Sequence, residues 1–488
     1  MLIRTATSGV DFLQLIPERA PSTGMTGWLV DALRAGISDG RLTTGAALPA
    51  SRVLAADLGI SRGVVVEAYR RLTDEGLIGG RQGAGTTVHA VGTVTGRRVP
   101  PAASAPPAPT RPSTTPIDLP GRQRWVGVDI DLSPGVPDLS AFPRAAWLSA
   151  ERAGLAAATP ADLGYGEPAG HPVLRRELAG WLTRTRGLRV TADDIVVVAG
   201  VAQSLALLCR VLRSRGVSAV AVEDPGSRGA SDELRYWHTE PVPVPVDDAG
   251  LRVDLLADTA TTAVLLTPAH QFPTGVVLAP ERRRALAEWA AGRDGLVIED
   301  DYDAEFRYDR APVPALQASA PDRVAYAGST SKSLSPGMRL GWLVPPPALR
   351  EEILQAKHAS DLGSPVIPQL GLAQLIAGGG YDRHIRLVRG RHRQRRDALL
   401  QALREQLPDI EIHGVAAGLH LIITLPSRSG ADDVELADRI FGVGVGVQPL
   451  SWHRHRAGPA GLVIGYAAHP PDRLREAARR IGGVIRSG

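Results

Sequence analysis

The sequence contains one cysteine and no long apolar run in its 488 residues. Cys209 cannot form a disulfide within the chain, so we expect a reducing compartment. The sequence also lacks a Cys/His cluster at zinc spacing and an uninterrupted apolar stretch of the ~18 residues that a membrane span requires. We therefore expect a cytoplasmic, globular protein without a metal site or a membrane partner.

Lysine is nearly absent as well. Only Lys332 and Lys357 are lysines, so 53 of the 55 basic residues are arginines. Arginine supplies charge and bidentate hydrogen bonds, but it does not lose its proton to become an amine nucleophile. A lysine that remains therefore suggests a chemical role. We interpret Lys357 as a surface residue without a role, and Lys332 as a candidate because hydroxyl groups and an arginine surround it.

The length predicts about three structural units at ~150 residues per domain. The segment from Gly92 to about Trp125 is rich in Pro, Ala, Thr and Ser, a composition typical of an extended, semi-rigid linker. We therefore predict an N-terminal domain over 1–88, a linker over 89–125 and a larger domain over 126–488.

The N-terminal domain has the pattern of a winged helix-turn-helix. Apolar spacing predicts helices over 27–38, over 53–58 with Ser51 as its cap, and from Ser61 as the cap to about residue 75. Residues 77–88 then predict a small hairpin whose turn begins at Arg81. Seven arginines against six acidic residues over 24–88 do not decide by themselves whether this domain binds nucleic acid.

The stretch from Gly45 to Ile78 resembles the DNA-binding domain of GntR-type bacterial repressors. The resemblance implies that Arg52 binds a DNA phosphate and that Arg62, at the start of the recognition helix, reaches a guanine. It also implies that further residues of this helix and of the wing contact operator DNA, namely Ser61, Gly63, Val64, Arg81, Gln82 and Gly83.

The larger domain predicts an α/β fold. Short apolar runs, mostly β-branched, predict strands over 195–198, 219–222, 263–266, 296–298 and 323–326. Helical segments such as 203–214 and 280–291 lie between several of them. This alternation predicts a mostly parallel central sheet with helices on both faces.

Three polar motifs follow predicted strands, where ligands bind in open α/β sheets. Gly200 to Gln203 opens a helix and can hold a phosphate, Glu299 to Tyr302 can place an anion beside a protonated ring nitrogen, and Ser329 to Arg339 contains Lys332. Each motif alone has a structural explanation. Together they indicate a phosphate beside a reactive lysine, and hence a pyridoxal phosphate site.

These motifs resemble fold type I aminotransferases, and their fusion to a GntR-like domain resembles the MocR subfamily of bacterial transcriptional regulators. The segments starting at Tyr165 and Thr267 add to the resemblance. It implies that Lys332 binds the cofactor covalently, that Asp300, in preference to Asp301, pairs with the ring nitrogen and that Tyr302 bonds the ring hydroxyl. The implied phosphate ligands are Ala202, Gln203, Ser329, Arg339 and, from the neighbouring subunit of a homodimer, Tyr165.

The sequence departs from aminotransferases at three places. Ser227 stands where relatives have an aromatic residue that stacks on the ring, and Gln271 or Phe272 stands where they have an asparagine. The segment from Gly461 to Tyr466 lacks the arginine that clamps a substrate carboxylate, for which Arg454 or Arg456 could substitute.

These departures favour a DNA-binding regulator that senses pyridoxal phosphate, an amino compound or both. The alternative is an active aminotransferase with a DNA-binding domain, and the sequence leaves enzymatic turnover open. A third hypothesis is a regulator that has lost the cofactor.

Overall fold

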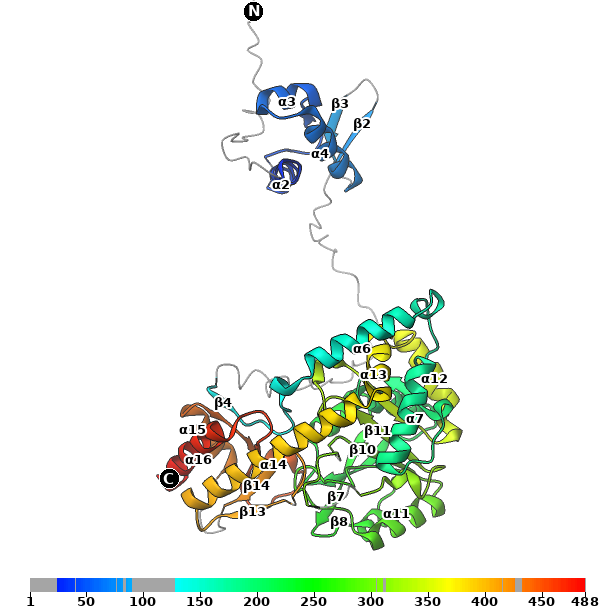
Figure 1. Ribbon diagram of the computed structural model, residues 1–488, viewed down its shortest axis with the longest axis vertical. Helices are drawn as coiled ribbons and strands as arrows, with labels where there is room; N and C mark the ends of the chain where they lie inside the picture. Colours follow the sequence, from blue (N-terminus) through cyan, green and yellow to red (C-terminus); the bar gives the residue numbers. More distant parts are fainter. Residues whose placement is uncertain are drawn as a thin grey trace, which may run out of the picture. The chain divides into compact units, whose positions relative to one another are not determined.

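The computed structural model describes residues 24–39, 41–75, 77–81, 85–89, 128–303, 305–309, 313–414, 416–425 and 432–487. The chain divides into two compact units, Met1–Thr110 and Arg111–Gly488, which we call the head and the body (Figure 1). Beyond residue 89, the predicted linker lies outside the described residues.

The head is a winged helix-turn-helix. It contains helices α2 (Met25–Ser38), α3 (Ser51–Leu58) and α4 (Arg62–Asp74). Strands β1 (Ala47–Leu48), β2 (Ile78–Arg81) and β3 (Gly85–Val88) form an antiparallel sheet in the order β1-β3-β2. The apolar faces of the helices and strands enclose one core, which includes Leu29, Leu33, Leu54, Val65 and Leu72.

Of the two predicted helix caps in the head, the position of Ser61 is confirmed and that of Ser51 is wrong. Ser51 is the first residue of α3, and Ala50, after Pro49, occupies the N-cap position. Ser61 does occupy the N-cap position of α4, but its side chain makes no capping hydrogen bond. The Ser61 hydroxyl is therefore available to a ligand.

The body is built on an eight-stranded sheet in the order β5-β12-β11-β10-β9-β6-β7-β8. The run from β11 through β10, β9 and β6 to β7 is parallel, whereas β12 is antiparallel to both of its neighbours. The predicted mostly parallel sheet is confirmed. The strands are β5 (Val196–Val198), β6 (Ala219–Asp224), β7 (Glu240–Asp247), β8 (Gly250–Leu251), β9 (Ala263–Leu266), β10 (Leu296–Asp301), β11 (Val324–Ser329) and β12 (Gly341–Val344).

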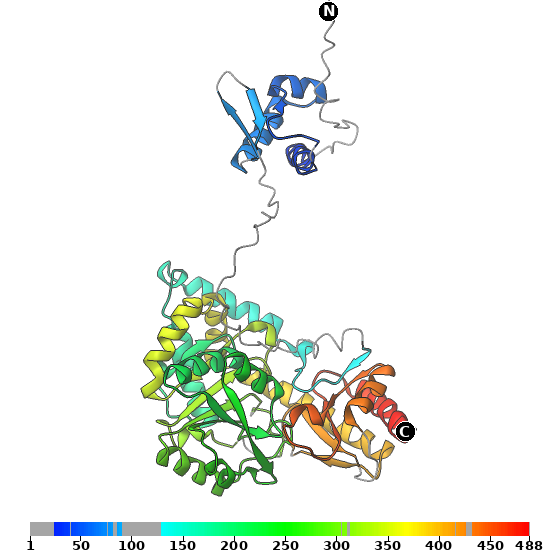
Figure 2. The ribbon, with the colours of Figure 1, turned by 180° about the vertical axis from the view of Figure 1, so that it is seen from behind.

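Helices cover both faces of this sheet because successive strand residues point to opposite sides (Figures 1 and 2). Val196 and Val198 pack with α8 (Val201–Ser214) and α12 (Pro347–Asp361), while Val197 between them packs on the other face. That other face is covered by α7 (Pro172–Arg186), α13 (Val366–Ala377), α10 (Val253–Ala257) and α11 (Pro280–Gly292).

A smaller lobe follows in the C-terminal third of the body. Its antiparallel sheet, in the order β13-β14-β17-β16, consists of β13 (Glu411–His413), β14 (His420–Thr424), β17 (Gly461–Gly465) and β16 (Gln448–Pro449). Helices α15 (Asp433–Gly442) and α16 (Pro471–Arg486) pack in the same core. Near the start of the body, strand β4 (Ile130–Asp131) pairs in parallel with β15 (Val445–Gly446) of this lobe.

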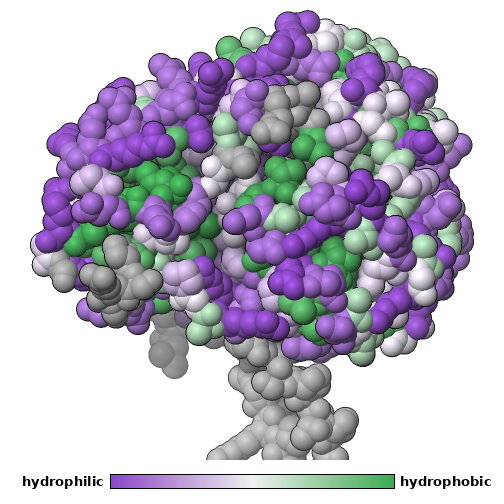
Figure 3. Space-filling model, turned by 90° about the horizontal axis from the view of Figure 1, so that it is seen from below, coloured by the Kyte–Doolittle hydropathy of each residue, from purple (hydrophilic) through white to green (hydrophobic). Residues whose placement is uncertain are grey.

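Helix α14 (Gly380–Gln406) connects the two lobes of the body (Figure 1). Tyr381, in its first turn, belongs to the core on one face of the large sheet, whereas Leu399 and Leu403 belong to the core of the smaller lobe. Hydrophilic side chains cover much of the body in the view of Figure 3, with hydrophobic patches between them. None of the helices in the described part of the chain has the length and hydrophobicity of a membrane span.

Candidate functional site

The carboxyl ends of β10 and β11 bring two of the predicted motifs together. These strands are parallel neighbours, with Asp300 opposite Ala327 in register. The acidic motif therefore ends beside the loop that contains Lys332, whose charge partly offsets the rise in the pKa of Asp300 that burial causes. The antiparallel strand β12 begins at Gly341, beside Val198 and Gly200 at the end of β5.

The adjacent carboxylates Asp300 and Asp301 have different surroundings. Asp301 is buried and forms an ion pair with Arg186, whose Nε lies 2.6 Å from Oδ2, and it accepts a hydrogen bond from Tyr326 at 2.5 Å. Oδ1 of Asp300 is buried without a hydrogen-bond partner. Burial, followed by the charge of Asp301, raises the pKa of Asp300 to about 7. An orphaned acceptor of this kind fits a protonated ring nitrogen, so the contacts support Asp300 over Asp301 for that role.

Tyr302 lies beside a buried histidine that the sequence motifs did not single out. The Tyr302 hydroxyl is 3.0 Å from Nδ1 of His270, and the same nitrogen is 3.0 Å from Oδ2 of Asp303. Burial raises the pKa of Tyr302 well above its usual value. The hydroxyl therefore stays protonated and can donate to a ligand or to the imidazole.

Lys332 reaches a loop that precedes it by almost two hundred residues. Its Nζ donates to the carbonyl oxygen of Gly135 at 2.7 Å, and Gly135 has a left-handed backbone with φ of 80°. A methyl group on Gly135 would lie 3.0 Å from that Nζ, so glycine leaves the room for the lysine.

The interpretation of Lys357 as a surface residue is wrong. Its side chain is fully buried, and its Nζ lies 2.8 Å from Oδ2 of Asp361 and 3.1 Å from the hydroxyl of Ser364. Burial lowers the pKa of Lys357. Because Asp361 also accepts from Gln203 at 2.8 Å, this lysine joins α12 to the start of α8.

The predicted phosphate ligands gather at the N-terminus of α8. Gly200 occupies the N-cap position with φ of 101°, and a methyl group there would lie 3.5 Å from both Nη1 and Nη2 of Arg339. Among the described residues, no carboxylate lies within ion-pair distance of Arg339. Ala202 is in the first turn of α8, where backbone N–H groups have no acceptor within the helix and can bind an anion. This arrangement of an unneutralised guanidinium beside a helix N-terminus suits a phosphate.

Gln203 and Ser329 are partly engaged within the protein. The Gln203 N–H donates to the carbonyl oxygen of Gly200 at 3.1 Å, and its side chain accepts from Ala199 and donates to Asp361. The hydroxyl oxygen of Ser329 accepts from the N–H of Ser331 at 3.3 Å and keeps its own proton to donate. Of these two residues, Ser329 has the freer donor.

Two residues at the departures from aminotransferases have different surroundings: Ser227 is a helix cap, and Phe272 belongs to an aromatic wall with His420 and His453. Ser227 caps α9 (Arg228–Tyr236) by accepting from the N–H of Ala230 at 3.2 Å. The ring of Phe272 lies 4.9 Å from that of His420 and 5.0 Å from that of His453. Burial lowers the pKa of His420 to about 3 and that of His453 to about 4, so both imidazoles are uncharged near neutral pH.

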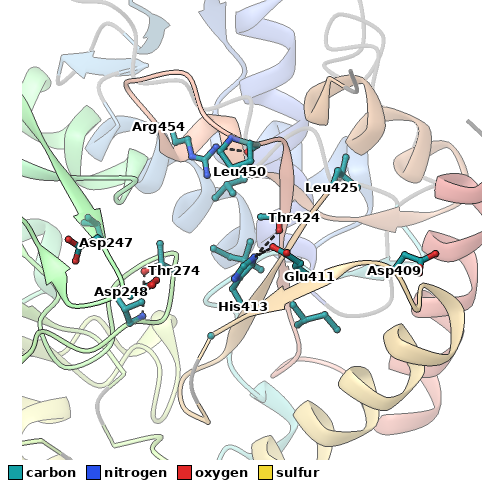
Figure 4. A pocket seen from close by; sticks show the side chains of 16 residues that line it. Asp247, Asp248, Thr274, Asp409, Glu411, His413, Thr424, Leu425, Leu450 and Arg454 are labelled. Carbon is teal, nitrogen blue, oxygen red and sulfur yellow. Dashed lines mark hydrogen bonds and ion pairs between the residues drawn. The ribbon is translucent and has the colours of Figure 1, made fainter. Parts of the chain in front are cut away.

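Neither arginine suggested as a substitute clamp is aimed at this wall. Arg454 donates to the carbonyl oxygen of Pro459 at 2.5 Å, and Arg456 is 3.9 Å from Asp224. Arg454 lines a groove of about 770 Å³ between the β7–β8 hairpin and the smaller lobe, together with Asp247, Asp248 and Glu411 (Figure 4). None of the predicted cofactor ligands lines that groove, and its carboxylates would repel a phosphate.

Tyr165, predicted to act on a neighbouring subunit, is 95 % exposed and precedes α7. It therefore contacts little of its own chain. In the described residues, no group of histidine, cysteine, aspartate or glutamate side chains is arranged to hold a metal ion.

In the head, ion pairs separate the arginines into two classes. Arg34, Arg41, Arg70 and Arg71 each lie within 3 Å of a carboxylate. Among the head arginines with described side chains, Arg52 and Arg62 alone have no carboxylate partner. Both are exposed, and Nε of Arg62 lies 3.4 Å from the hydroxyl of Ser51.

The remaining residues predicted to contact DNA differ in their exposure. Ser61 and Gly63 are exposed at the start of α4, whereas Val64 is half-buried against the core of the head. Arg81 ends β2, and its side chain is outside the described set, as are Gln82 and Gly83. Val66, which we did not predict, is 47 % exposed on the same helix.

Comparisons with known proteins match both units. The family model for bacterial regulatory proteins of the gntR family matches residues 27–88, and that for aminotransferase class I and II matches residues 128–481. The HTH-type pyridoxine biosynthesis transcriptional regulator PdxR of Corynebacterium glutamicum is 33 % identical, over 94 % of this chain and 96 % of its own. The probable rhizopine catabolism regulatory protein MocR of Rhizobium meliloti is 31 % identical, over 95 % of this chain and 94 % of its own.

The body also resembles solved enzymes. The crystal structure of Pyrococcus horikoshii kynurenine aminotransferase, solved in complex with PMP, superposes with a TM-score of 0.69 at 28 % identity. The match covers 75 % of this chain and 93 % of that one.

Proposed function

Because this chain belongs to the MocR-type regulators, in which a GntR-family DNA-binding domain is joined to a class I and II aminotransferase domain, we propose that it is a transcriptional regulator that binds operator DNA and responds to pyridoxal phosphate. The observation that carries the proposal is the presence, in one chain, of a head in which Arg52 and Arg62 have no carboxylate partner among the described residues, and of a body whose orphaned Asp300 and glycine turn beside Arg339 fit that cofactor.

The head supplies the DNA contacts. Arg52 and Arg62 can place their charges against phosphate and guanine without breaking an ion pair of the protein. The Ser61 hydroxyl makes no capping bond and can donate to the same groove. Operator DNA lies in the bacterial cytoplasm, which is where we place the protein.

The body supplies the cofactor site. We assign the ring nitrogen to Asp300, the ring hydroxyl to Tyr302, the covalent link to Lys332, and the phosphate to Ala202, Gln203, Ser329 and Arg339. When bound, pyridoxal phosphate supplies an aldehyde that condenses with a primary amine and releases water. Asp300 holds the negative charge that a protonated ring requires, and Arg339 with the N-terminus of α8 neutralises the phosphate.

A regulator is favoured over an efficient aminotransferase because the site lacks a substrate clamp. Strand β17 contains no arginine, and Arg454 and Arg456 are directed to Pro459 and Asp224. His420 and His453 are uncharged, so this wall offers no cation to an amino-acid carboxylate. The relative named for pyridoxine biosynthesis supports the cofactor itself as the signal.

We further propose a homodimer formed through the exposed apolar surface of the body. Leu148 and Leu155 on α6 (Arg144–Ala157), and Ile367 on α13, are between 43 % and 62 % exposed. Tyr165, which is 95 % exposed, would reach the phosphate of the partner. Burying such residues between two copies is favourable.

The test is the visible absorption spectrum of the full chain after addition of pyridoxal phosphate and gel filtration. The wild type is expected to retain a protein-bound band, whereas Lys332→Arg, which keeps the charge but not the amine, is expected to lose it. A band retained by Lys332→Arg would overturn the assignment. Repeated conversion of an amino donor and a keto acid would favour the aminotransferase alternative.

A further inference from the structure

We propose that Gly63 and Val66 of the recognition helix α4 form an apolar recess that receives the C5-methyl group of a thymine next to the guanine contacted by Arg62. This inference rests on the proposed DNA-binding function and deepens it, because it names two residues and one base that determine sequence specificity.

Val66 lies on the outer face of α4. The inner face is formed by Val65, Ala68, Tyr69 and Leu72, all of which are buried. Val66 is 47 % exposed and is not part of the core of the head. It follows Arg62 by four residues, so the two side chains are neighbours on one face of the helix. A branched apolar side chain is thus presented beside the arginine that is expected to read a base.

Gly63 has no structural reason to be glycine. It is the second residue of α4, and its backbone is outside the left-handed region that favours glycine. A methyl group at this position would meet only the hydroxyl oxygen of Ser61, at 3.9 Å. Since glycine destabilises a helix relative to alanine, the missing side chain costs stability and leaves an open space beside Val66.

The rest of the outer face of α4 is occupied by ion pairs. Glu67 lies 2.8 Å from Arg70 and 2.9 Å from Arg71, and Asp74 lies 2.6 Å from Arg70. These side chains form ion pairs with one another, so their charges largely cancel. Direct contact with bases is therefore confined to the first turn of α4 and Val66, the part of a recognition helix that enters the major groove.

The chemistry of this surface selects thymine. In the major groove, thymine is the unmodified base that presents a methyl group, and apolar side chains recognise it by contact. Arg62 has no carboxylate partner and is free to pair with the neighbouring guanine. Gly63 provides the space for the methyl group and Val66 provides the apolar wall.

The experiment begins with selection of an operator from random DNA by the full-length protein. Each thymine of the selected site is then replaced by uracil, which removes only the methyl group, and affinity is measured by fluorescence anisotropy. The wild type is expected to lose about three- to tenfold in affinity at one thymine per half-site, next to a conserved guanine. Val66→Ala is expected to bind the thymine operator correspondingly more weakly and to be insensitive to the uracil replacement.

Gly63→Ala provides an independent test, because it is expected to raise stability and to lower the affinity for the thymine operator. It is expected to raise the melting temperature of the head by about 4 °C, because alanine favours the helix. It is also expected to weaken binding to the thymine operator and to recover affinity on the uracil operator, where the added methyl group has room.

Two outcomes would overturn the inference: a wild type that binds thymine and uracil operators equally, or a Val66→Ala variant that keeps the full sensitivity to uracil. Failure to select any operator would instead contradict the proposed DNA-binding function, so the two failures are distinguishable.

Discussion

Adjacent residues of the same type are given different roles by their partners. Asp301 is neutralised by Arg186, which lies 115 residues earlier in the chain and is only 1 % exposed. Asp300 next to it retains a buried oxygen without a hydrogen bond. The ion pair removes Asp301 from ligand binding, while burial, followed by the negative charge of Asp301, raises the pKa of Asp300.

We predict that Asp300→Asn stabilises the cofactor-free protein but weakens cofactor binding. The pKa of Asp300 is about 7 in the folded protein and near 3.8 when unfolded, so the folded state loses stability as the pH rises from about 4 to about 7. Asparagine cannot ionise, so its advantage should grow over this interval and then remain constant. This advantage is measured as the difference in melting temperature between the variant and the wild type, both cofactor-free, between pH 5 and pH 8. Each kcal/mol of added stability is expected to raise the melting temperature by about 2–4 °C.

The same variant should bind pyridoxal phosphate at least tenfold more weakly at pH 8, because it cannot pair ionically with a protonated ring. Equal affinity in an absorbance titration, or a melting-temperature difference that does not change with pH, would contradict the assignment of Asp300.

At this scale the sequence predicted the types of residue but not their partners. The motif Glu299 to Tyr302 identified the acidic site, yet the choice between its two aspartates depends on Arg186, which carries no signal in the sequence. Lys357 was misassigned for the same reason, since its burial depends on Asp361 and Ser364. His420 and His453 are isolated in the sequence and meet Phe272 only in the fold.

At the scale of elements, we propose that the N-terminus of helix α8 binds the phosphate. Gly200 at its start and Gly216 just after its end both have left-handed backbones, with φ of 101° and 81°. A methyl group at Gly200 would approach the guanidinium of Arg339, whereas one at Gly216 would meet nothing within 4 Å. Alanine would therefore be strained at both positions, but only at Gly200 would its methyl group approach another side chain.

We predict that Gly200→Ala lowers the affinity for pyridoxal phosphate by tenfold or more, since it displaces Arg339 and strains the turn that presents the N-terminus of α8. Gly216→Ala, the matched control, should lose stability without a comparable loss of affinity. Absorbance titrations of both proteins, with circular dichroism to confirm folding, provide the comparison. Equal losses in the two variants would mean that only backbone strain matters.

The elements were predictable where their patterns are regular. The five predicted strands correspond to β5, β6, β9, β10 and β11, because each contains a short, buried apolar run. Strand β12, Gly341–Val344, was not predicted, since it follows the lysine loop almost directly and runs antiparallel. The strands of the smaller lobe were also missed, several of them being only two or three residues long.

At the scale of the whole molecule, two kinds of site are joined in one chain. The head has exposed arginines that we assign to DNA, and the body contains the proposed phosphate site and Lys332. Relatives that match more than nine-tenths of this chain are named as regulators, whereas the solved enzyme matches the body alone. The fusion is useful only if occupancy of the body alters DNA binding by the head, which requires a coupling free energy between the two sites.

The most direct test of this account is the affinity of the full-length chain for its selected operator, measured by fluorescence anisotropy with and without saturating pyridoxal phosphate. We predict that the cofactor changes the wild-type dissociation constant by about five- to a hundredfold and leaves that of Lys332→Arg unchanged. An operator affinity of the wild type that is the same with and without pyridoxal phosphate would contradict the account.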